Sequence, residues 1–467
     1  MNTWTHAFTI GQFILDFSVV SGLLLLGTLC RRYVGWFQRY LIPNNLIAGF
    51  LGLILGPELL GMAVFSPERM GIYVYHLLAL TFIGVGLQSG GGKHSRGAIN
   101  LGFIQIMSML LQAVIGLGVV LVMVYFVNPD LVPAVGVLLP LGFGMGPGIA
   151  YAIGQSWQAY GFAEGASIGL TIAAIGFLVA YGSGILIVNR GIRRGHAVLV
   201  RRTDSLSQDV RTGIVSADTP EARPVAARMT FTAGAIEPLT FHVALVATIY
   251  LVTYGVTLAL AEALVLVGLE REVPTLWSFQ FILANLIALT TGRLMHRRRI
   301  AHLLDEGFLH RLTGLLADYL IAASIMAISL TVAWDYIVPI ALMCAVAALA
   351  TYASIKWVSQ RVFEDYPFER FVGIYGEMTG TISSGLALVR VVDPEYKTPV
   401  AQDLVLSSGL ALGFGFPLLL AINMPFTVFD GALEGYWTLL GIIVAYLVLI
   451  VLAWTRFGLQ RQKRMTF

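Results

Sequence analysis

The chain has 467 residues, of which 57% are hydrophobic and only 12% are charged, and its formal net charge is +3. Soluble domains carry about twice that share of charged residues, so the composition excludes an ordinary soluble protein and indicates an all-α membrane protein. The small positive charge gives no reason to expect a nucleic-acid partner. The two cysteines, Cys30 and Cys344, cannot make a disulfide framework, and no role is expected for them.

Eleven apolar stretches are long enough to cross a bilayer as helices of about 20 residues. No Lys or Arg precedes Arg31, so the charged start of a signal peptide is missing. The expected spans are 11–30, 44–62, 73–90, 101–127, 164–188, 239–266, 275–292, 312–332, 336–355, 399–422 and 434–455.

Two glycine-rich stretches, Gly142–Gly154 and Gly376–Gly385, lie between these spans, and a shift of 232 residues pairs Gly148 with Gly380. Helices interrupted by glycine at equivalent points of two repeats indicate the binding site of a transporter. We interpret both stretches as re-entrant hairpins, and glycine-rich packing helices are the alternative.

This interpretation predicts two inverted repeats, each with five transmembrane helices and one hairpin. The predicted parts are the first repeat at 1–189 with its hairpin at 133–157, a linker at 190–237, the second repeat at 238–425 with its hairpin at 371–390, and an extra transmembrane helix with a basic tail at 426–467.

The basic residues favour the same topology. With the N-terminus outside, 27 of the 29 Lys and Arg fall on the cytoplasmic side, together with the linker and the C-terminus, and the exceptions are Arg69 and Arg271. Such an asymmetry is typical of multi-pass membrane proteins. The arginines of the linker are expected to lie near anionic lipid heads.

The broken segments suggest how a polar solute is bound. A half-helix that begins within the membrane exposes its first N–H groups and the positive end of its dipole, which suits an anion, and unwound carbonyl groups suit Na⁺. Few polar side chains surround the first hairpin, so its backbone would bind, and Pro147 suits a turn or a first helical position. In the second hairpin, hydroxyl groups either bind the solute or cap freed backbone groups.

Several ionisable or polar positions are candidates for function. Glu377 either binds a cation, a proton or a substrate amino group, or is a hydrated structural group. Arg390 either clamps a substrate carboxylate or is an anchor that pairs with Asp393. Asp318 is a candidate ion or proton ligand that Ser324 and Gln88 would join, whereas Asp16, near the interface, is expected to be structural.

The candidate substrate-binding residues are Gly144, Met145, Gly146, Gly148, Glu377, Thr379, Gly380, Thr381, Ser383, Ser384 and Arg390. The candidate ion-binding residues are Glu377, Thr379, Asp318 and Gln88. We expect no metal centre, no cofactor and no enzymatic activity, because the chain has no nucleotide-binding loop, nucleophile motif or metal-ligand spacing.

Several stretches resemble the bacterial sodium/glutamate symporter family: 40–52, 78–88, 142–165 and the Gly376–Gly385 hairpin. The resemblance implies inverted repeats, Na⁺-coupled glutamate uptake, a mobile hairpin unit that moves like an elevator against a dimeric scaffold, and a location in the bacterial inner membrane. The chain departs from the family pattern at Gly142–Met145, where a Gly-Gly-His-Gly run is usual, and at Asn44 and Asn45, where Glu-Pro is usual.

We therefore expect a secondary active transporter that carries a small carboxylate with Na⁺, glutamate being the first candidate. A cation/proton antiporter that uses Glu377 or Asp318, with H⁺ as the coupling ion, is the alternative. A channel is less favoured than these two, and a membrane-embedded enzyme is the least favoured.

Overall fold

The computed structural model describes residues 10–62, 64–88, 95–200, 208–215, 225–232, 234–394 and 396–457. This part of the chain is helical and contains no strand. The α-helices are α1 (Ile10–Tyr33), α2 (Gly35–Arg39), α3 (Asn44–Leu55), α4 (Pro67–Gln88), α5 (Arg96–Phe126), α6 (Ala134–Phe143), α7 (Pro147–Ser156), α8 (Gly165–Arg193), α9 (Gln208–Thr212), α10 (Pro238–Leu266), α11 (Val273–Ser278), α12 (Gln280–Arg297), α13 (Glu306–Met326), α14 (Leu330–Asp335), α15 (Ile337–Val362), α16 (Pro367–Met378), α17 (Ile382–Val392), α18 (Val400–Ala421), α19 (Met424–Thr427) and α20 (Leu433–Phe457).

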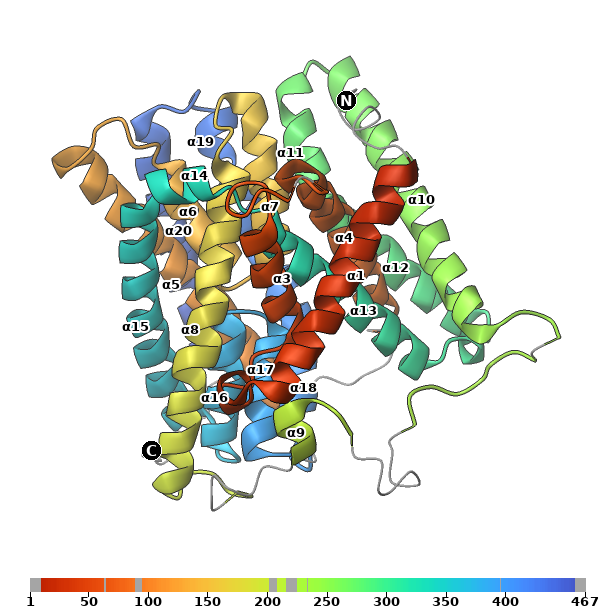
Figure 1. Cartoon of the computed structure of the whole chain (residues 1–467). Coiled ribbons are helices and arrows are strands. Elements are labelled where there is room, and N and C mark those ends of the chain that lie inside the picture. Colours follow the sequence, from red (N-terminus) through yellow and green to blue (C-terminus); the bar gives the residue numbers. More distant parts are fainter. Residues whose placement is uncertain are drawn as a thin grey trace.

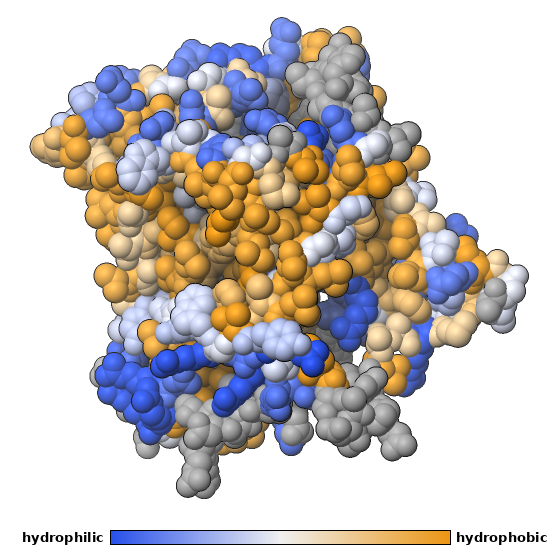
Figure 2. All heavy atoms as spheres, viewed as in Figure 1, coloured by the Kyte–Doolittle hydropathy of each residue, from blue (hydrophilic) through white to orange (hydrophobic). Residues whose placement is uncertain are grey.

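Long apolar helices dominate this fold (Figure 1). Nine helices of the described residues are long and apolar enough to cross a membrane, and the bent pair α11–α12 makes a tenth. Figure 2 shows a broad hydrophobic band between two hydrophilic rims. The chain therefore has the helices and the surface that a membrane protein needs.

Two expected spans take a different form. The stretch 44–62 holds only the 12-residue helix α3, because the helix ends at Gly56, directly before Pro57. A residue before proline is driven out of the helical region, and Gly56 has ψ of 176°. The stretch 275–292 is divided into α11 and α12, which meet at Phe279 with a bend of 61°.

Both glycine-rich stretches interrupt helices. Between α6 and α7, Gly146 has φ of 94°, and Pro147 is the first residue of α7, the position predicted for a proline that starts a helix. Between α16 and α17, the break covers 379–381. Each of these four helices has 10–12 residues and is about 15–18 Å long, roughly half the thickness of a bilayer's hydrocarbon.

The helix α8 contacts both interrupted pairs, one with each half of its length. Its first half packs against α7, where a Cβ at Gly169 would lie 3.1 Å from Cβ of Ala150. Its second half packs against α17, where a Cβ at Gly184 would lie 2.5 Å from Cδ1 of Leu388. The two pairs therefore lie toward opposite ends of α8. In Figure 1 α6 and α7 are in the upper half, and α16 and α17 are in the lower half.

The helices form two groups by their contacts. We call α5–α8 and α15–α18 the hairpin body, because α5 and α8 hold both interrupted pairs. We call α1, α3, α4, α10, α12 and α13 the outer body, in which α4 packs on α12 and α13, and α3 packs on α13. The two bodies touch where α7 meets α4, and a Cβ at Gly148 would lie 3.3 Å from Cβ of Leu78.

The last helix, α20, lies along the hairpin body. It packs on α5 and also contacts α18 and α19. Trp454 donates from Nε1 to Oδ1 of Asn100 at 3.0 Å, near the start of α5. Trp437 donates to the hydroxyl of Tyr125 at 3.2 Å, near the end of α5. Both ends of α20 are thus attached to one neighbouring helix.

Candidate functional site

The tips of the two interrupted pairs meet in the interior. A Cβ at Gly146 would lie 3.1 Å from Cγ2 of Thr381, so the two breaks are in contact. The helix α8 passes the same point at Gly176, where a Cβ would lie only 2.6 Å from the carbonyl oxygen of Thr379. Only glycine permits this close approach of helix and tip.

Gln112 of α5 bridges the two tips. Its Nε2 donates to the carbonyl oxygen of Met378 at 2.8 Å and to Oγ1 of Thr351 at 3.1 Å. Its Oε1 lies 2.8 Å from the position of a Cβ at Gly144 and has no hydrogen-bond partner among the described residues. One amide side chain therefore holds the end of α16 and presents an acceptor to the first break.

Several buried oxygens around the tips lack hydrogen-bond partners within the described chain. Besides Oε1 of Gln112, they are Oε1 of Gln105 and Oγ1 of Thr381. An unpaired buried polar atom is costly, and it is found where a ligand or ion satisfies it. These are hard oxygen ligands, the kind that alkali and alkaline-earth cations take. The helices α7 and α17 begin here, so their first N–H groups also face this region.

Glu377 is buried beside this site with an exposed fraction of 5%. Its Oε2 accepts from Nε2 of Gln105 at 2.7 Å, and its Oε1 accepts from Oγ of Ser408 at 2.7 Å. Gln105 also donates to Oγ of Ser407 at 3.0 Å. No Lys or Arg of the described residues lies within ion-pair distance of the carboxylate. The arrangement can hold a proton or a bound cation, which would remove the unpaired charge.

Other predicted residues of the second hairpin lie around the tip in different roles. Thr379 caps its own helix, because its Oγ1 donates to the carbonyl oxygen of Tyr375 at 2.8 Å. Gly380 lies against Ser384, whose Oγ would be 2.7 Å from a Cβ there. Ser383 is exposed rather than enclosed by the tips.

Arg390 lies at the far end of α17, away from the tip, and is exposed. The expected pairing with Asp393 is absent from the described ion pairs. The Asp393 carboxylate instead accepts from the backbone N–H groups of Lys397 and Thr398, both at 2.8 Å, and from the Thr398 hydroxyl at 2.7 Å. These local donors satisfy the buried carboxylate without Arg390.

The predicted residues of the first hairpin lie in two different surroundings. Gly144 and Gly146 lie at the tip, and the Cε atom of Met145 is 3.8 Å from a Cβ at Gly415 of α18. Gly148 instead faces Leu78 of α4, in the contact between the two bodies. Gly148 is therefore a packing position in this structure.

The polar residues predicted outside the hairpins belong to the outer body. Asp318 accepts from Nδ2 of Asn45 at 2.8 Å. This candidate ion ligand therefore contacts one of the two asparagines that depart from the family pattern. Gln88 donates to Oγ1 of Thr313 at 2.9 Å, and Ser324 donates to its own helix. Neither joins Asp318. Asp16 is fully buried and binds Arg69 through both carboxylate oxygens, at 2.8 and 3.0 Å, as expected of a structural group.

Sequence reasoning missed the polar side chains that surround the tips. Gln105 and Gln112 are separated by seven residues, which is two helical turns, and so lie on one face of α5. Two amides on one face of a 31-residue apolar helix were the signal that could have found them. Thr351, Ser407 and Ser408 carry no such signal, because single hydroxyls are common in membrane helices.

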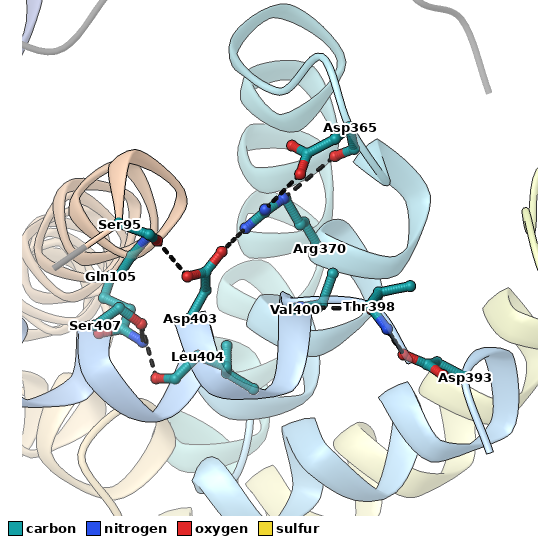
Figure 3. Close-up of polar contacts among 11 residues, drawn as sticks. Ser95, Gln105, Asp365, Arg370, Asp393, Thr398, Val400, Asp403, Leu404 and Ser407 are labelled. Carbon is teal, nitrogen blue, oxygen red and sulfur yellow. Dashed lines mark hydrogen bonds and ion pairs between the residues drawn. The ribbon is translucent and has the colours of Figure 1, made fainter. Parts of the chain in front are cut away.

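A buried ion-pair network anchors the second hairpin at its base (Figure 3). Arg370, with a side chain 2% exposed, donates to Asp403 of α18 at 2.7 Å and to Asp365 at 3.0 Å. Ser95, the N-cap of α5, donates to the other oxygen of Asp403. Close packing at Gly97 completes the join, because a Cβ there would overlap Asp403 and Arg370. The network ties α16, α18 and the start of α5 together.

The described residues contain no group of three or more His, Cys, Asp or Glu side chains that could hold a metal ion. Comparison of the chain with protein-family models, with curated proteins and with solved structures finds no match.

Proposed function

We propose that the protein is a secondary active transporter that couples Na⁺ to the movement of a small carboxylate, with glutamate or a related amino acid as the first candidate. The observation that carries the proposal is the contact of two interrupted helix pairs at Gly146 and Thr381, with unpartnered buried oxygens around them. Broken helices at membrane depth are tolerated where they line a solute site.

The packing of the helices supports an inverted repeat. Two contacts between the halves have the same form: α3 of the first half packs on α13 of the second, and α12 of the second half packs on α4 of the first. Likewise α6 and α7 pack on α8, and α16 and α17 pack on α18. We propose that the hairpin body moves as a unit along the outer body, in an elevator-like cycle that exposes the tips to each side in turn. The protein would act as a homodimer in the bacterial inner membrane, with its basic rim in the cytoplasm.

Each part of the site would have a defined role. The first N–H groups of α7 and α17 would face the carboxylate of the solute, because both carry the positive end of a helix dipole. The free oxygens of Gln112 and Thr381 would ligate Na⁺ or accept from the solute, and the hydroxyl of Ser384 would assist them. Glu377 would bind the coupling cation, next to the tip of α16.

A cation/proton antiporter is the second candidate, and the surroundings of Glu377 favour it over a channel. The carboxylate is buried and bonded only to the neutral donors Gln105 and Ser408 among the described residues. A carboxyl group in such a place can exchange H⁺ for Na⁺ as the hairpin body moves. Asp318 is a less enclosed candidate for the same task, since it is exposed.

Transport by purified protein in proteoliposomes tests the proposal. We expect uptake of radiolabelled glutamate that rises with an inward Na⁺ gradient and stops when an ionophore dissipates that gradient. Empty liposomes and liposomes with the Gly146→Val variant are the controls. Absence of glutamate uptake, combined with dissipation of a pH gradient by Na⁺, would replace the symporter with the antiporter, and steady unitary currents would indicate a channel.

A further inference from the structure

A second polar region lies in the outer body, apart from the hairpin tips. It is a cavity of about 590 Å³ between α1, α3 and α13, and no residue of α6, α7, α16 or α17 lines it. A hydrophilic hollow also interrupts the apolar band in the lower half of Figure 2. Charged side chains that line a cavity between long apolar helices need an explanation, because such groups are usually retained for a task.

One part of the cavity wall offers acceptors. Asp318 lines the cavity near the middle of α13 and is exposed, and only its Oδ1 accepts a hydrogen bond among the described residues, from Asn45 at 2.8 Å. Asn44 also lines the cavity. Its Nδ2 donates to Thr28 at 3.0 Å, while its Oδ1 is buried and has no partner within the described chain. The Asp318 carboxylate, whose Oδ2 accepts no hydrogen bond from the described residues, suits an ammonium group, which has three N–H donors.

Two arginine side chains line another part of the cavity wall. Arg31 of α1 and Arg311 of α13 both line the cavity, and neither has an ion pair among the described residues. Arg31 is held in place by α9, because it donates to the carbonyl oxygens of Val210 at 3.0 Å and of Arg211 at 3.3 Å. Guanidinium groups bind carboxylates with two parallel hydrogen bonds. His310 also lines the cavity.

We propose that this cavity binds an acidic α-amino acid as a zwitterion, with its ammonium group at Asp318 and its two carboxylates at Arg31 and Arg311. The charges of the ligand and the cavity are complementary, since one positive and two negative groups meet one carboxylate and two guanidinium groups. The cavity is thus a second, recognition site of the transporter. The inference rests on the proposed function only for the class of solute, and it selects an amino acid over a dicarboxylate.

The test compares glutamate with glutarate, which has both carboxylates but lacks the amino group. Binding is measured by titration calorimetry on the full-length protein in detergent, with Na⁺ present. We expect wild-type protein to bind glutamate at least tenfold more tightly than glutarate. In Asp318→Asn combined with Gly146→Val, which removes binding at the tips, glutamate binding should fall to the level of glutarate. Asp335→Asn, an exposed acid on α14 outside the cavity, is the matched control.

A second variant keeps the test decisive if Asp318→Asn is poorly folded. Arg311→Gln changes an exposed side chain and should weaken glutamate and glutarate binding by the same factor. Equal binding of the two ligands by the Gly146→Val variant, or unchanged selectivity when Asp318→Asn is added to it, would overturn the proposal. So would a failure of Arg311→Gln to weaken either ligand.

The Gly146→Val variant separates this inference from the proposed function. It should abolish transport at the tips and still bind glutamate in the cavity with wild-type selectivity. Loss of all glutamate binding in this variant would assign the ligand to the tips and reject the cavity site. Selective binding without Na⁺-driven uptake by wild-type protein would retain the cavity site and reject the symporter.

Discussion

Gly146 occupies a backbone conformation, with φ of 94° and ψ of 167°, that is essentially restricted to glycine. The Gly146→Ala variant should cost roughly 1–3 kcal/mol in backbone strain, and the new methyl group would press on Thr381 at 3.1 Å. We expect at least a tenfold loss of uptake in proteoliposomes.

Gly118→Ala is the matched control for this change. Gly118 lies within α5, and a Cβ there meets nothing within 4 Å. Alanine favours a helix over glycine by roughly 0.5–1 kcal/mol, so this variant should be as stable as the wild type or more so, with normal uptake. Normal uptake by Gly146→Ala would remove the contact between the tips from the mechanism.

Glu377→Gln removes a charge while its hydrogen bonds can remain. The amide oxygen can accept from Gln105, and the hydroxyl of Ser408 can turn to accept from the new NH₂ group. We expect a folded protein in which uptake no longer rises with Na⁺, measured over a series of Na⁺ concentrations. Glu262→Gln, an exposed position on α10, should behave like the wild type. A wild-type Na⁺ response in Glu377→Gln would show that this carboxylate takes no part in coupling.

Asp403 is expected to stabilise the fold and to take no part in solute binding. Asp403→Asn leaves the buried Arg370 guanidinium with Asp365 alone, whose side chain is 51% exposed. Breaking a buried ion pair by removing one partner costs about 3–5 kcal/mol, so the thermal unfolding temperature in detergent should fall. The exposed pair of Arg271 and Asp430 gives the comparison, and Asp430→Asn should leave that temperature unchanged. Equal effects of the two changes would contradict this account of the network.

At the scale of helices, the contact between α4 and α7 tests whether the two bodies move against each other. In a background without Cys30 and Cys344, cysteines at 78 and 148 would have Cβ atoms about 3.3 Å apart, close to disulfide geometry. Oxidation should stop uptake, and reduction should restore it, because the bond joins the hairpin body to the outer body.

A pair inside the hairpin body controls for the chemistry of crosslinking. Cysteines at 150 and 169 join α7 to α8, where the corresponding Cβ atoms are 3.1 Å apart. Their disulfide should leave uptake unchanged. If oxidation of the 78–148 pair also leaves uptake unchanged, no sliding occurs at the contact between α4 and α7.

The sequence predicted the helices and the two breaks because local signals determine them. Glycines around Gly146 and the following proline stop a helix wherever they occur, and apolar length alone marks a span. The same logic failed at α3, because apolar residues continue after Gly56 and Pro57 and concealed the end of the helix.

The candidate site was only partly predictable, because its contacts join residues far apart in the chain. Gln105 and Glu377 are separated by 272 positions, and Gln112 and Met378 by 266. Such pairs depend on which faces of α5 and α16 meet, and that is a property of packing rather than of local composition. The meeting of Asp318 with Asn45 has the same origin.

The predicted orientation of the whole molecule in the membrane rests on the distribution of its Lys and Arg residues, and labelling tests it. Single cysteines replace two exposed residues, Asp130 between α5 and α6 and Val215 after α9, in the cysteine-free background. With the predicted cytoplasmic linker, a membrane-impermeant maleimide should label position 130 in intact cells and position 215 only in inverted vesicles. The reverse pattern would show that the protein has the opposite orientation in the membrane. Labelling of both positions from one side would contradict the assignment of the two rims to opposite sides.

Because α20 is attached along α5, its position can report the position of the hairpin body. Since Trp454 and Trp437 fasten it at both ends, it would travel with the hairpin body, whereas α10 belongs to the other group. A donor dye on α20 and an acceptor dye on α10 would then turn each transport cycle into a change of fluorescence energy transfer. Single molecules could be watched as they switch sides, without a label near the solute.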